Sequence, residues 1–196
     1  LVLGKVDAVI ITSPTVTHAD YVRQAAKYVK NIFVEKPLAA TLSEADSLWK
    51  LSQKKALNIQ VGFIERFNPA IIQLKKVLSQ SAKIVSVDFT RTNRISTRIT
   101  DVDVIADLMI HDIDLALYLN GPVRSVSAHG FIKDKMIDFA SALLTHTNGH
   151  FSRIQASRIT DKKARSIQAT CLDMFVDCDL LRREIIINRQ TETHQK

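Results

Sequence analysis

Glycine is scarce in this sequence of 196 residues. The chain contains five glycines, fewer than the roughly 7% of residues found in average proteins, and they lie apart at Gly4, Gly62, Gly121, Gly130 and Gly149. A loop that binds phosphate through its backbone needs two or more glycines within one short turn. The dinucleotide motif G-x-G-x-x-G and the nucleotide motif G-x-x-x-x-G-K-[ST] are therefore both excluded.

Cysteine is scarce as well, and long apolar segments are absent. The two cysteines, Cys171 and Cys178, cannot build a disulfide framework and do not have the spacing of a zinc site. No apolar run reaches the roughly 18 residues that a membrane-spanning helix requires. The opening residues show neither the basic leader nor the apolar core of a signal peptide, so we expect a cytoplasmic protein without a membrane partner.

The remaining composition indicates an ordinary globular protein. Apolar residues make up 46% and charged residues 24% of the chain, enough to form a core without disulfides or a structural metal. The formal net charge of +7 is carried mainly by residues 1–80, which would suit an anionic ligand or nucleic acid. Because the lysines are scattered along helix-like segments without interleaved aromatic residues, we expect a solvated basic surface and no nucleic-acid partner.

Residues 1–80 alternate between short β-branched runs, which predict strands, and amphipathic stretches, which predict helices. In chain order these segments are Val6–Ile11, Val16–Val29, Ile32–Val34, Leu42–Leu57, Ile59–Phe63 and Pro69–Leu78. The first run is typical of a strand buried on both faces, and Thr41 or Ser43 is expected to cap the second helix. Three strand–helix repeats predict a parallel sheet with crossover helices, which is an α/β domain.

The pattern changes after Ser81. A strand is expected at Ile84–Arg91, and a long helix at Val104–Leu119 is ended by Asn120-Gly121-Pro122. Further strands are expected at Arg124–Ile132, Phe139–Thr147, His150–Ile159, Arg165–Leu172, Met174–Leu180 and Glu184–Asn188. Residues 81–196 are therefore expected to form an α+β domain on a mostly antiparallel sheet, with the boundary to residues 1–80 near Gln80.

Candidate chemistry lies first at the strand ends, because an open parallel sheet binds ligands at the carboxyl ends of its strands. Thr12-Ser13-Pro14, Glu35-Lys36-Pro37 and Phe63–Arg66 occupy those ends. A lysine held there and partly buried is suited to donate a proton. The alternative is a solvent-facing Glu–Lys pair before a turn.

The long helix carries the second candidate set. Asp103, Asp107, His111 and Asp114 are spaced to form one stripe on an otherwise apolar helix. Asp103 is explained as the N-cap. Asp107 and His111 suit acid–base work, whereas metal binding is disfavoured because no third ligand has convincing spacing. A structural His–Asp pair is the remaining alternative.

Four stretches in order carry a family resemblance: Ala8–Pro14 with His18, Glu35–Pro37, Gly62–Pro69 and Asp107–His111. The chain resembles the glucose-fructose oxidoreductase / inositol dehydrogenase / MocA (Gfo/Idh/MocA) family of nicotinamide-dependent sugar dehydrogenases. The resemblance implies that Lys36 and His111 are the catalytic pair and that Asp107 orients the histidine or binds substrate. It implies cofactor contacts from Thr12, Ser13, Pro14, His18, Glu35, Lys36 and Arg66, and substrate contacts from Lys36, Arg66, Asn68, Asp107 and His111.

The resemblance also implies NAD or NADP as cofactor, a sugar or nucleotide-sugar substrate, and a homo-oligomer formed through the C-terminal sheet. Glu65–Pro69 followed by Ile110–Leu115 is similar to the branch that oxidises C3 of UDP-linked N-acetylamino sugars. The rival function is a non-catalytic oligomerising or ligand-binding module derived from the same family.

One departure from the family is large. The glycine turn and the ribose-binding acidic residue lie on the family's first two strands, whereas this chain begins about where the fourth would. We therefore expect the second half of a Rossmann domain followed by a complete substrate domain, inactive alone and without useful affinity for the cofactor. Val6–Ile11 would be an exposed edge strand. Lys36 and His111 are expected to share one cleft, and which of them is the base stays open.

Overall fold

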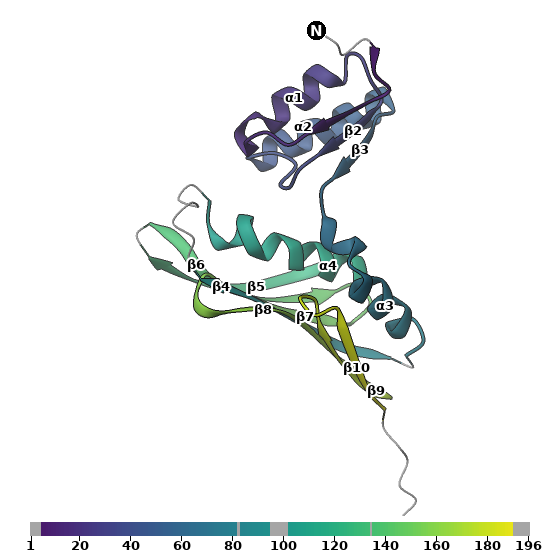
Figure 1. The fold of residues 1–196 in the computed structure, drawn as a ribbon, viewed down its shortest axis with the longest axis vertical. Helices are drawn as coiled ribbons and strands as arrows, with labels where there is room; N and C mark the ends of the chain where they lie inside the picture. Colours follow the sequence, from purple (N-terminus) through teal and green to yellow (C-terminus); the bar gives the residue numbers. More distant parts are fainter. Residues whose placement is uncertain (1–4, 82, 95–101, 134, 190–196) are drawn as a thin grey trace, which may run out of the picture. The chain divides into compact units, whose positions relative to one another are not determined.

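The computed structural model describes residues 5–81, 83–94, 102–133 and 135–189, and the contacts divide the chain into two units. The first unit spans Leu1–Phe63 and the second Ile64–Lys196. Figure 1 shows the two small crossover helices of the first unit and the long antiparallel strands of the second. The opening Leu1–Gly4 lies outside the described residues.

The first unit is a three-stranded parallel sheet with two crossover helices, as the sequence predicts. Its elements are β1 (Ala8–Ile11), the 3-10 turn η2 (Thr15–Thr17), α1 (His18–Ala25), β2 (Asn31–Val34), α2 (Leu42–Lys55) and β3 (Asn58–Val61). The strands pair in the order β1-β2-β3, which makes β2 the central strand. The loops after all three strands consequently lie at one edge of this sheet.

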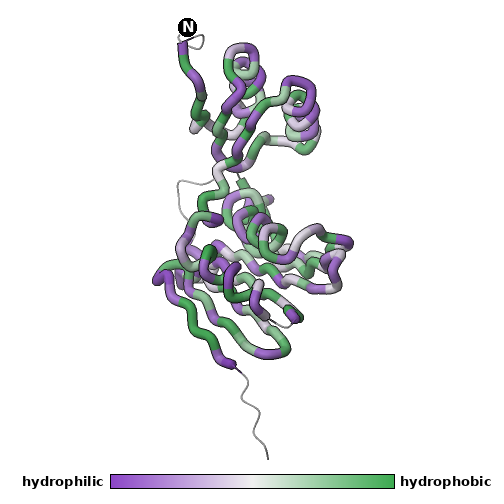
Figure 2. Tube along the Cα trace, turned by 90° about the vertical axis from the view of Figure 1, so that its right-hand side faces the viewer, coloured by the Kyte–Doolittle hydropathy of each residue, from purple (hydrophilic) through white to green (hydrophobic). Residues whose placement is uncertain are grey.

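Local sequence explains both helices. Thr41 is the N-cap of α2, and it forms a capping box in which the Glu44 N–H donates to Thr41 Oγ1 and Glu44 Oε2 accepts from the Thr41 N–H. The alternation of hydrophilic and hydrophobic residues along α1 and α2 is visible in Figure 2. The apolar sides meet the sheet in a core that includes Val22 from α1, Leu48 from α2 and Val34 from β2.

Strand β1 is buried on one face only, contrary to the expectation from its continuous apolar sequence. Ile11 is buried, whereas the side chain of Ile10 is 72% exposed. Both helices contact each other and the same core, so they cover one face of the sheet. Among the described residues β1 pairs with β2 alone, which confirms the expected edge strand.

The second unit is an α+β fold on a seven-stranded sheet. Its elements are the 3-10 turn η3 (Ile64–Phe67), α3 (Pro69–Leu78), β4 (Ile84–Arg94), the π-helix η4 (Ile105–Met109), α4 (Ile110–Asn120), β5 (Val123–Lys133), β6 (Met136–His146), β7 (Phe151–Ser157), β8 (Ile159–Cys171), β9 (Met174–Asp179) and β10 (Glu184–Arg189). The strand order is β10-β9-β8-β4-β7-β6-β5, and every pairing except β4 with β7 is antiparallel. The expected mostly antiparallel sheet is confirmed.

Helix α3 belongs to the second unit, so the division falls at Phe63 and Ile64 rather than near Gln80. Pro69 stands at its first turn, as expected, and Asn68 caps it. Its buried side chains, among them Ile71 and Leu74, join the core formed by the seven-stranded sheet and α4. The expected helix is confirmed, but periodicity cannot show against which sheet its apolar face packs.

The helix expected from Val104 begins as a π-helix. Asp103 Oδ1 accepts hydrogen bonds from the N–H groups of Ile105 and Ala106, which confirms Asp103 as the cap. Regular α-helix follows from Ile110 to Asn120, and Gly121 ends it with φ +82°. Single π turns are rare and occur frequently at functional sites. This one carries Asp107.

Candidate functional site

The first group of candidate residues lies at the carboxyl ends of the parallel strands. Thr12 and Ser13 follow β1, and Glu35 and Lys36 follow the central strand β2. Thr12 is exposed, whereas Ser13, Glu35 and Lys36 are half-buried. The Glu35 N–H donates to the carbonyl of Ile11, the last residue of β1, at 2.9 Å, so the pairing continues one residue beyond the end of β2. The peptide bond between Lys36 and Pro37 is cis.

His18 ties two of these loops together. Its ring is buried, with Nδ1 2.8 Å from the Pro37 carbonyl and Nε2 2.8 Å from the Ser13 carbonyl. Both ring nitrogens therefore contact backbone oxygens of the protein. The sequence resemblance implies a cofactor contact for His18; the geometry shows a side chain that holds the loop after β1 against the loop that contains Lys36.

Glu35 lies close to Gly62, the residue that follows β3. A Cβ atom added to Gly62 would lie 2.9 Å from Glu35 Oε2, closer than real Cβ atoms come to such neighbours, and 3.0 Å from Phe33 Cζ, which is tighter than most real Cβ contacts. The Gly62 N–H donates to the Val34 carbonyl at 2.8 Å, which fixes this residue beside the end of β2. The absence of a side chain at Gly62 thus leaves the space that the Glu35 carboxylate occupies.

We expect Gly62→Ala to lower the free energy of unfolding by about 1–2 kcal/mol, because the new methyl overpacks this corner of the sheet. Adding Glu35→Ala should restore part of the loss, since the carboxylate is the nearest displaced group. Urea unfolding of the 196-residue chain measures both variants. Unchanged stability of Gly62→Ala would contradict this expectation and show that the Glu35 carboxylate moves away from the new methyl group at little cost.

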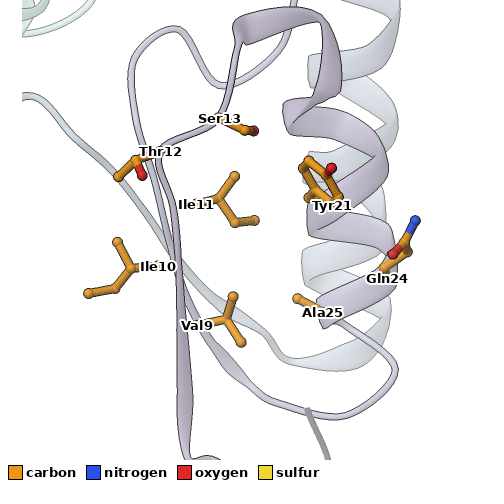
Figure 3. Close-up of a pocket in the computed structure, with 8 residues that line it drawn as sticks. All are labelled: Val9, Ile10, Ile11, Thr12, Ser13, Tyr21, Gln24 and Ala25. Carbon is orange, nitrogen blue, oxygen red and sulfur yellow. The ribbon is translucent and has the colours of Figure 1, made fainter. Parts of the chain in front are cut away.

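A groove of about 350 Å³ runs along the free edge of β1. It is lined by Val9, Ile10, Ile11, Thr12, Ser13, Tyr21, Gln24 and Ala25. In Figure 3 the side chains of Val9 and Ile11 lie on the side of β1 that faces α1, and Ile10 lies on the other side. The lining is mostly apolar, so the groove suits packed protein or an apolar ring better than phosphate.

The second group of candidate residues lies in the second unit, on η4 and α4. Asp107 is in the π-helix and His111 is in the first turn of α4, and both are half-buried. The expected stripe assumed α-helical spacing throughout. Because η4 is a π-helix, the angle between Asp107 and His111 around the axis differs from that assumption.

Arg66 and Asn68 are engaged within the second unit. Arg66 donates from Nε and Nη2 to the two carboxylate oxygens of Asp114, at 2.8 and 2.6 Å, and lies over the ring of Tyr118. The hydrogen bond to Asp114 raises the pKa of Arg66. Asn68 accepts from the Ala70 N–H and donates to the Leu180 carbonyl, so its amide closes the start of α3.

A buried charged cluster joins η3, β4 and α4. Arg91 donates to both carboxylate oxygens of Asp112, at 2.9 and 2.8 Å, and to Glu65 Oε1 at 3.0 Å. Arg91 and Asp112 are each 2% exposed and Glu65 is 7% exposed. Arg165 also donates to Glu65 Oε1. Removing one partner of such a buried pair costs about 3–5 kcal/mol, because a charge is left without a partner.

Burial and ion pairing act in opposite directions in this cluster. Burial alone would raise the pKa of Glu65, but the guanidinium groups of Arg91 and Arg165 outweigh it and leave that pKa below its ordinary value. For Asp112 burial prevails and raises its pKa despite Arg91. Sequence reasoning did not find this cluster. One signal was present: Arg91 follows Val87 and Phe89 at an inward position of β4, where an apolar residue is expected.

Two further features bear on possible ligands. The described residues contain no group of three or more His, Cys, Asp or Glu side chains that would hold a metal ion. Within the same residues no helix is both long and apolar enough to cross a membrane.

Comparison with known proteins assigns both units to one family. The model of the GFO/IDH/MocA oxidoreductase family, NAD-binding Rossmann fold, matches residues 2–63, and that of the GFO/IDH/MocA C-terminal domain matches residues 82–173. The chain belongs to the Gfo/Idh/MocA family. The resemblance drawn from the four motifs and the expected fold class are thereby confirmed.

Individual relatives in this family are similar along most of the chain. The UDP-N-acetylglucosamine 3-dehydrogenase of Acidithiobacillus ferrooxidans is 34% identical over 189 residues, which cover 94% of this chain and 59% of the relative. A solved structure of that enzyme has a TM-score of 0.87 at 33% identity and covers 96% of this chain and 62% of that one. The scyllo-inositol 2-dehydrogenase (NAD(+)) of Bacillus subtilis is 34% identical over 167 residues, 78% of this chain and 49% of the relative. The chain thus spans about half to three-fifths of the length of these proteins.

The residues present fit one half of a dinucleotide. Thr12, Ser13 and the Glu35–Pro37 loop line the strand ends, where a Rossmann fold places a nicotinamide ring. No pair of the five glycines forms a turn that would hold a pyrophosphate through backbone N–H groups. The residues after β1 and β2 therefore lie where an open α/β sheet binds its ligand, whereas the glycines of this chain do not fit a pyrophosphate.

Proposed function

We propose that this chain is the nicotinamide-side and substrate-binding part of an NAD(P)-dependent dehydrogenase acting on a sugar or nucleotide sugar. The observation that carries the proposal is the position of Glu35-Lys36-Pro37 directly after the central strand of the parallel sheet, half-buried between the ends of β1 and β3. This is where an open α/β sheet binds its ligand. The named dehydrogenases among the relatives support the same reaction class.

In the proposed reaction a sugar C–OH becomes a carbonyl, and the C–H electron pair leaves as hydride. A bound nicotinamide supplies the hydride acceptor. One of Lys36 and His111 takes the hydroxyl proton, and the other hydrogen-bonds to the oxygen as its carbonyl character develops. His18 holds the Lys36 loop, and Asp107 orients His111 or contacts the sugar.

The finer proposal is oxidation at C3 of a UDP-linked N-acetylamino sugar. It rests on the Glu65–Pro69 and Ile110–Leu115 stretches and on the 34% identity to a UDP-N-acetylglucosamine 3-dehydrogenase. The two stretches are also in contact within the second unit, because Arg66 from the first forms an ion pair with Asp114 from the second.

We propose that the groove along β1 is where a segment with a pyrophosphate-binding glycine turn would pack, since this chain's own glycines form no such turn. A further parallel strand paired to β1 would bring a glycine turn beside Thr12 and Ser13, and a helix on the open face of the sheet would cover the exposed side chain of Ile10. The greater length of the relatives supports this arrangement.

We further propose that copies associate through the face of the seven-stranded sheet opposite α3 and α4. Exposed apolar side chains on that sheet, including Leu143, Phe151 and Phe175, support an interface there. Such an interface is compatible both with the dehydrogenase and with the non-catalytic alternative, so it does not choose between them.

The test is a dehydrogenase assay on the complete gene product with NAD or NADP. We expect reduction of the cofactor with UDP-N-acetylglucosamine and slower reduction with inositol. If inositol supports reduction of the cofactor and UDP-N-acetylglucosamine does not, the reaction class stands and the C3 proposal is refuted. No reduction with any sugar or nucleotide sugar would favour the non-catalytic module.

A further inference from the structure

The cluster around Arg91 neutralises buried charge, and it also joins the turn η3 to the helix α4. Glu65 lies in η3, the turn that directly follows the first unit, and Asp112 lies in α4 next to His111. Arg91 contacts both carboxylates at 2.8–3.0 Å. The turn and the helix are therefore held by one rigid, planar group whose five N–H donors have a fixed geometry.

A second clamp joins the same turn to the same helix. Arg66, the neighbour of Glu65, binds both carboxylate oxygens of Asp114. Successive residues of an α-helix are about 100° apart around the axis, so Asp112 and Asp114 project about 200° apart. Guanidinium groups thus bind carboxylates on nearly opposite sides of α4. These two pairs together oppose rotation of the helix about its own axis. His111 directly precedes Asp112 in the same turn of α4.

We propose that Arg91 is a positioning residue: by holding Asp112 against Glu65 it fixes the orientation of the turn of α4 that presents His111. The proposal rests on the proposed function in so far as His111 is catalytic. Arg91 contacts neither substrate nor cofactor in this account and acts through the helix. The bidentate geometry, and not the positive charge alone, is the property that matters, so lysine cannot replace arginine here.

The first test observes His111 directly in the 196-residue chain, without cofactor or substrate. Its imidazole signal in a carbon–proton NMR spectrum is identified by its loss in His111→Gln. We expect Arg91→Lys, which keeps the charge, to shift or broaden that signal. The signal of His146, which is bonded to the Gly121 carbonyl at the other end of α4, should stay in place. Arg153→Lys is the matched control, because Arg153 pairs with Asp88 at an exposed position of the same sheet.

The second test measures kinetics of the complete gene product. Arg91→Lys should lower kcat by roughly 10- to 100-fold, the scale of a misplaced catalytic group, with a much smaller change in KM. Arg91→Met should be no better than Arg91→Lys, and Arg153→Lys should match the wild type. If Arg91→Lys does not fold, Arg91→Met with Asp112→Leu replaces the pair by apolar groups, which buried pairs often tolerate, and the same shift of His111 is expected.

The outcomes separate the two proposals. A folded Arg91→Lys variant with an unmoved His111 signal and a kcat within about twofold of wild type would overturn the positioning role and leave Arg91 as a stabilising residue. A lower melting temperature with an unmoved His111 signal would do the same. If Arg91→Lys shifts the His111 signal but the wild-type protein reduces no cofactor, the positioning of His111 is supported and the dehydrogenase function is refuted.

Discussion

Replacing Lys36 with alanine in the complete gene product is expected to lower kcat by roughly 10²-fold or more, the usual effect of removing a positioned acid or base. Lys36 directly follows the central strand β2 and is half-buried at the edge of the sheet where ligands bind. The free energy of unfolding should change by less than about 1 kcal/mol, because a lysine at a strand end contributes little packing. Steady-state kinetics and thermal unfolding measure the two quantities.

Lys54→Ala is the matched control for this experiment, because Lys54 is an exposed lysine on α2 of the same unit. It should leave both kcat and stability near their wild-type values. A Lys36→Ala variant with nearly normal turnover would remove Lys36 from the catalytic assignment. A variant that loses activity only because it unfolds would be recognised by its melting temperature.

The 196-residue chain should bind NAD several orders of magnitude more weakly than a dehydrogenase of this family that carries the glycine turn. Its scattered glycines provide no turn for the pyrophosphate. Each lost hydrogen bond to a charged group costs about 1.5–3 kcal/mol, and each 1.4 kcal/mol is about tenfold in affinity. Calorimetric titration of both proteins with NAD measures the difference.

A titration with nicotinamide mononucleotide is the control for this claim, since it carries the half of the cofactor that Thr12, Ser13 and the Lys36 loop are proposed to contact. The two ligands should bind the 196-residue chain with similar, weak affinity. Micromolar binding of NAD to this chain would mean that a glycine turn is dispensable, and the account of the cofactor site would be wrong.

Most of the fold follows from patterns that act locally. The turn residues and the two hydrophobic periods place most strands and helices close to their observed bounds, although β8 begins at Ile159 and not at the expected Arg165. Pro69, Asp103 and Gly121 mark helix ends where the structure has them. The side chain of Ile10 shows the limit of this reasoning. An apolar strand residue is expected to be buried, yet burial depends on a neighbouring strand or helix that no local pattern reports.

The site shows the same division between local and long-range information. Glu35-Lys36-Pro37 is found from its place after a strand, but the contact of Glu35 with Gly62 and the bridge made by His18 depend on loops brought together by the sheet. Arg91 and Asp112 are 21 residues apart in sequence. Only the inward position of Arg91 on β4 hints that an acidic partner must be nearby.

The central proposal is that Lys36 and His111 serve one chemical step, and a double-mutant cycle on the complete gene product tests it most directly. The measured quantity is kcat for Lys36→Ala, His111→Ala and the double variant, with UDP-N-acetylglucosamine and NAD. Residues that serve one step are strongly non-additive, so the double variant should be about as slow as the slower single variant. Two single losses that multiply in the double variant, or a single variant with normal kcat, would contradict the claim.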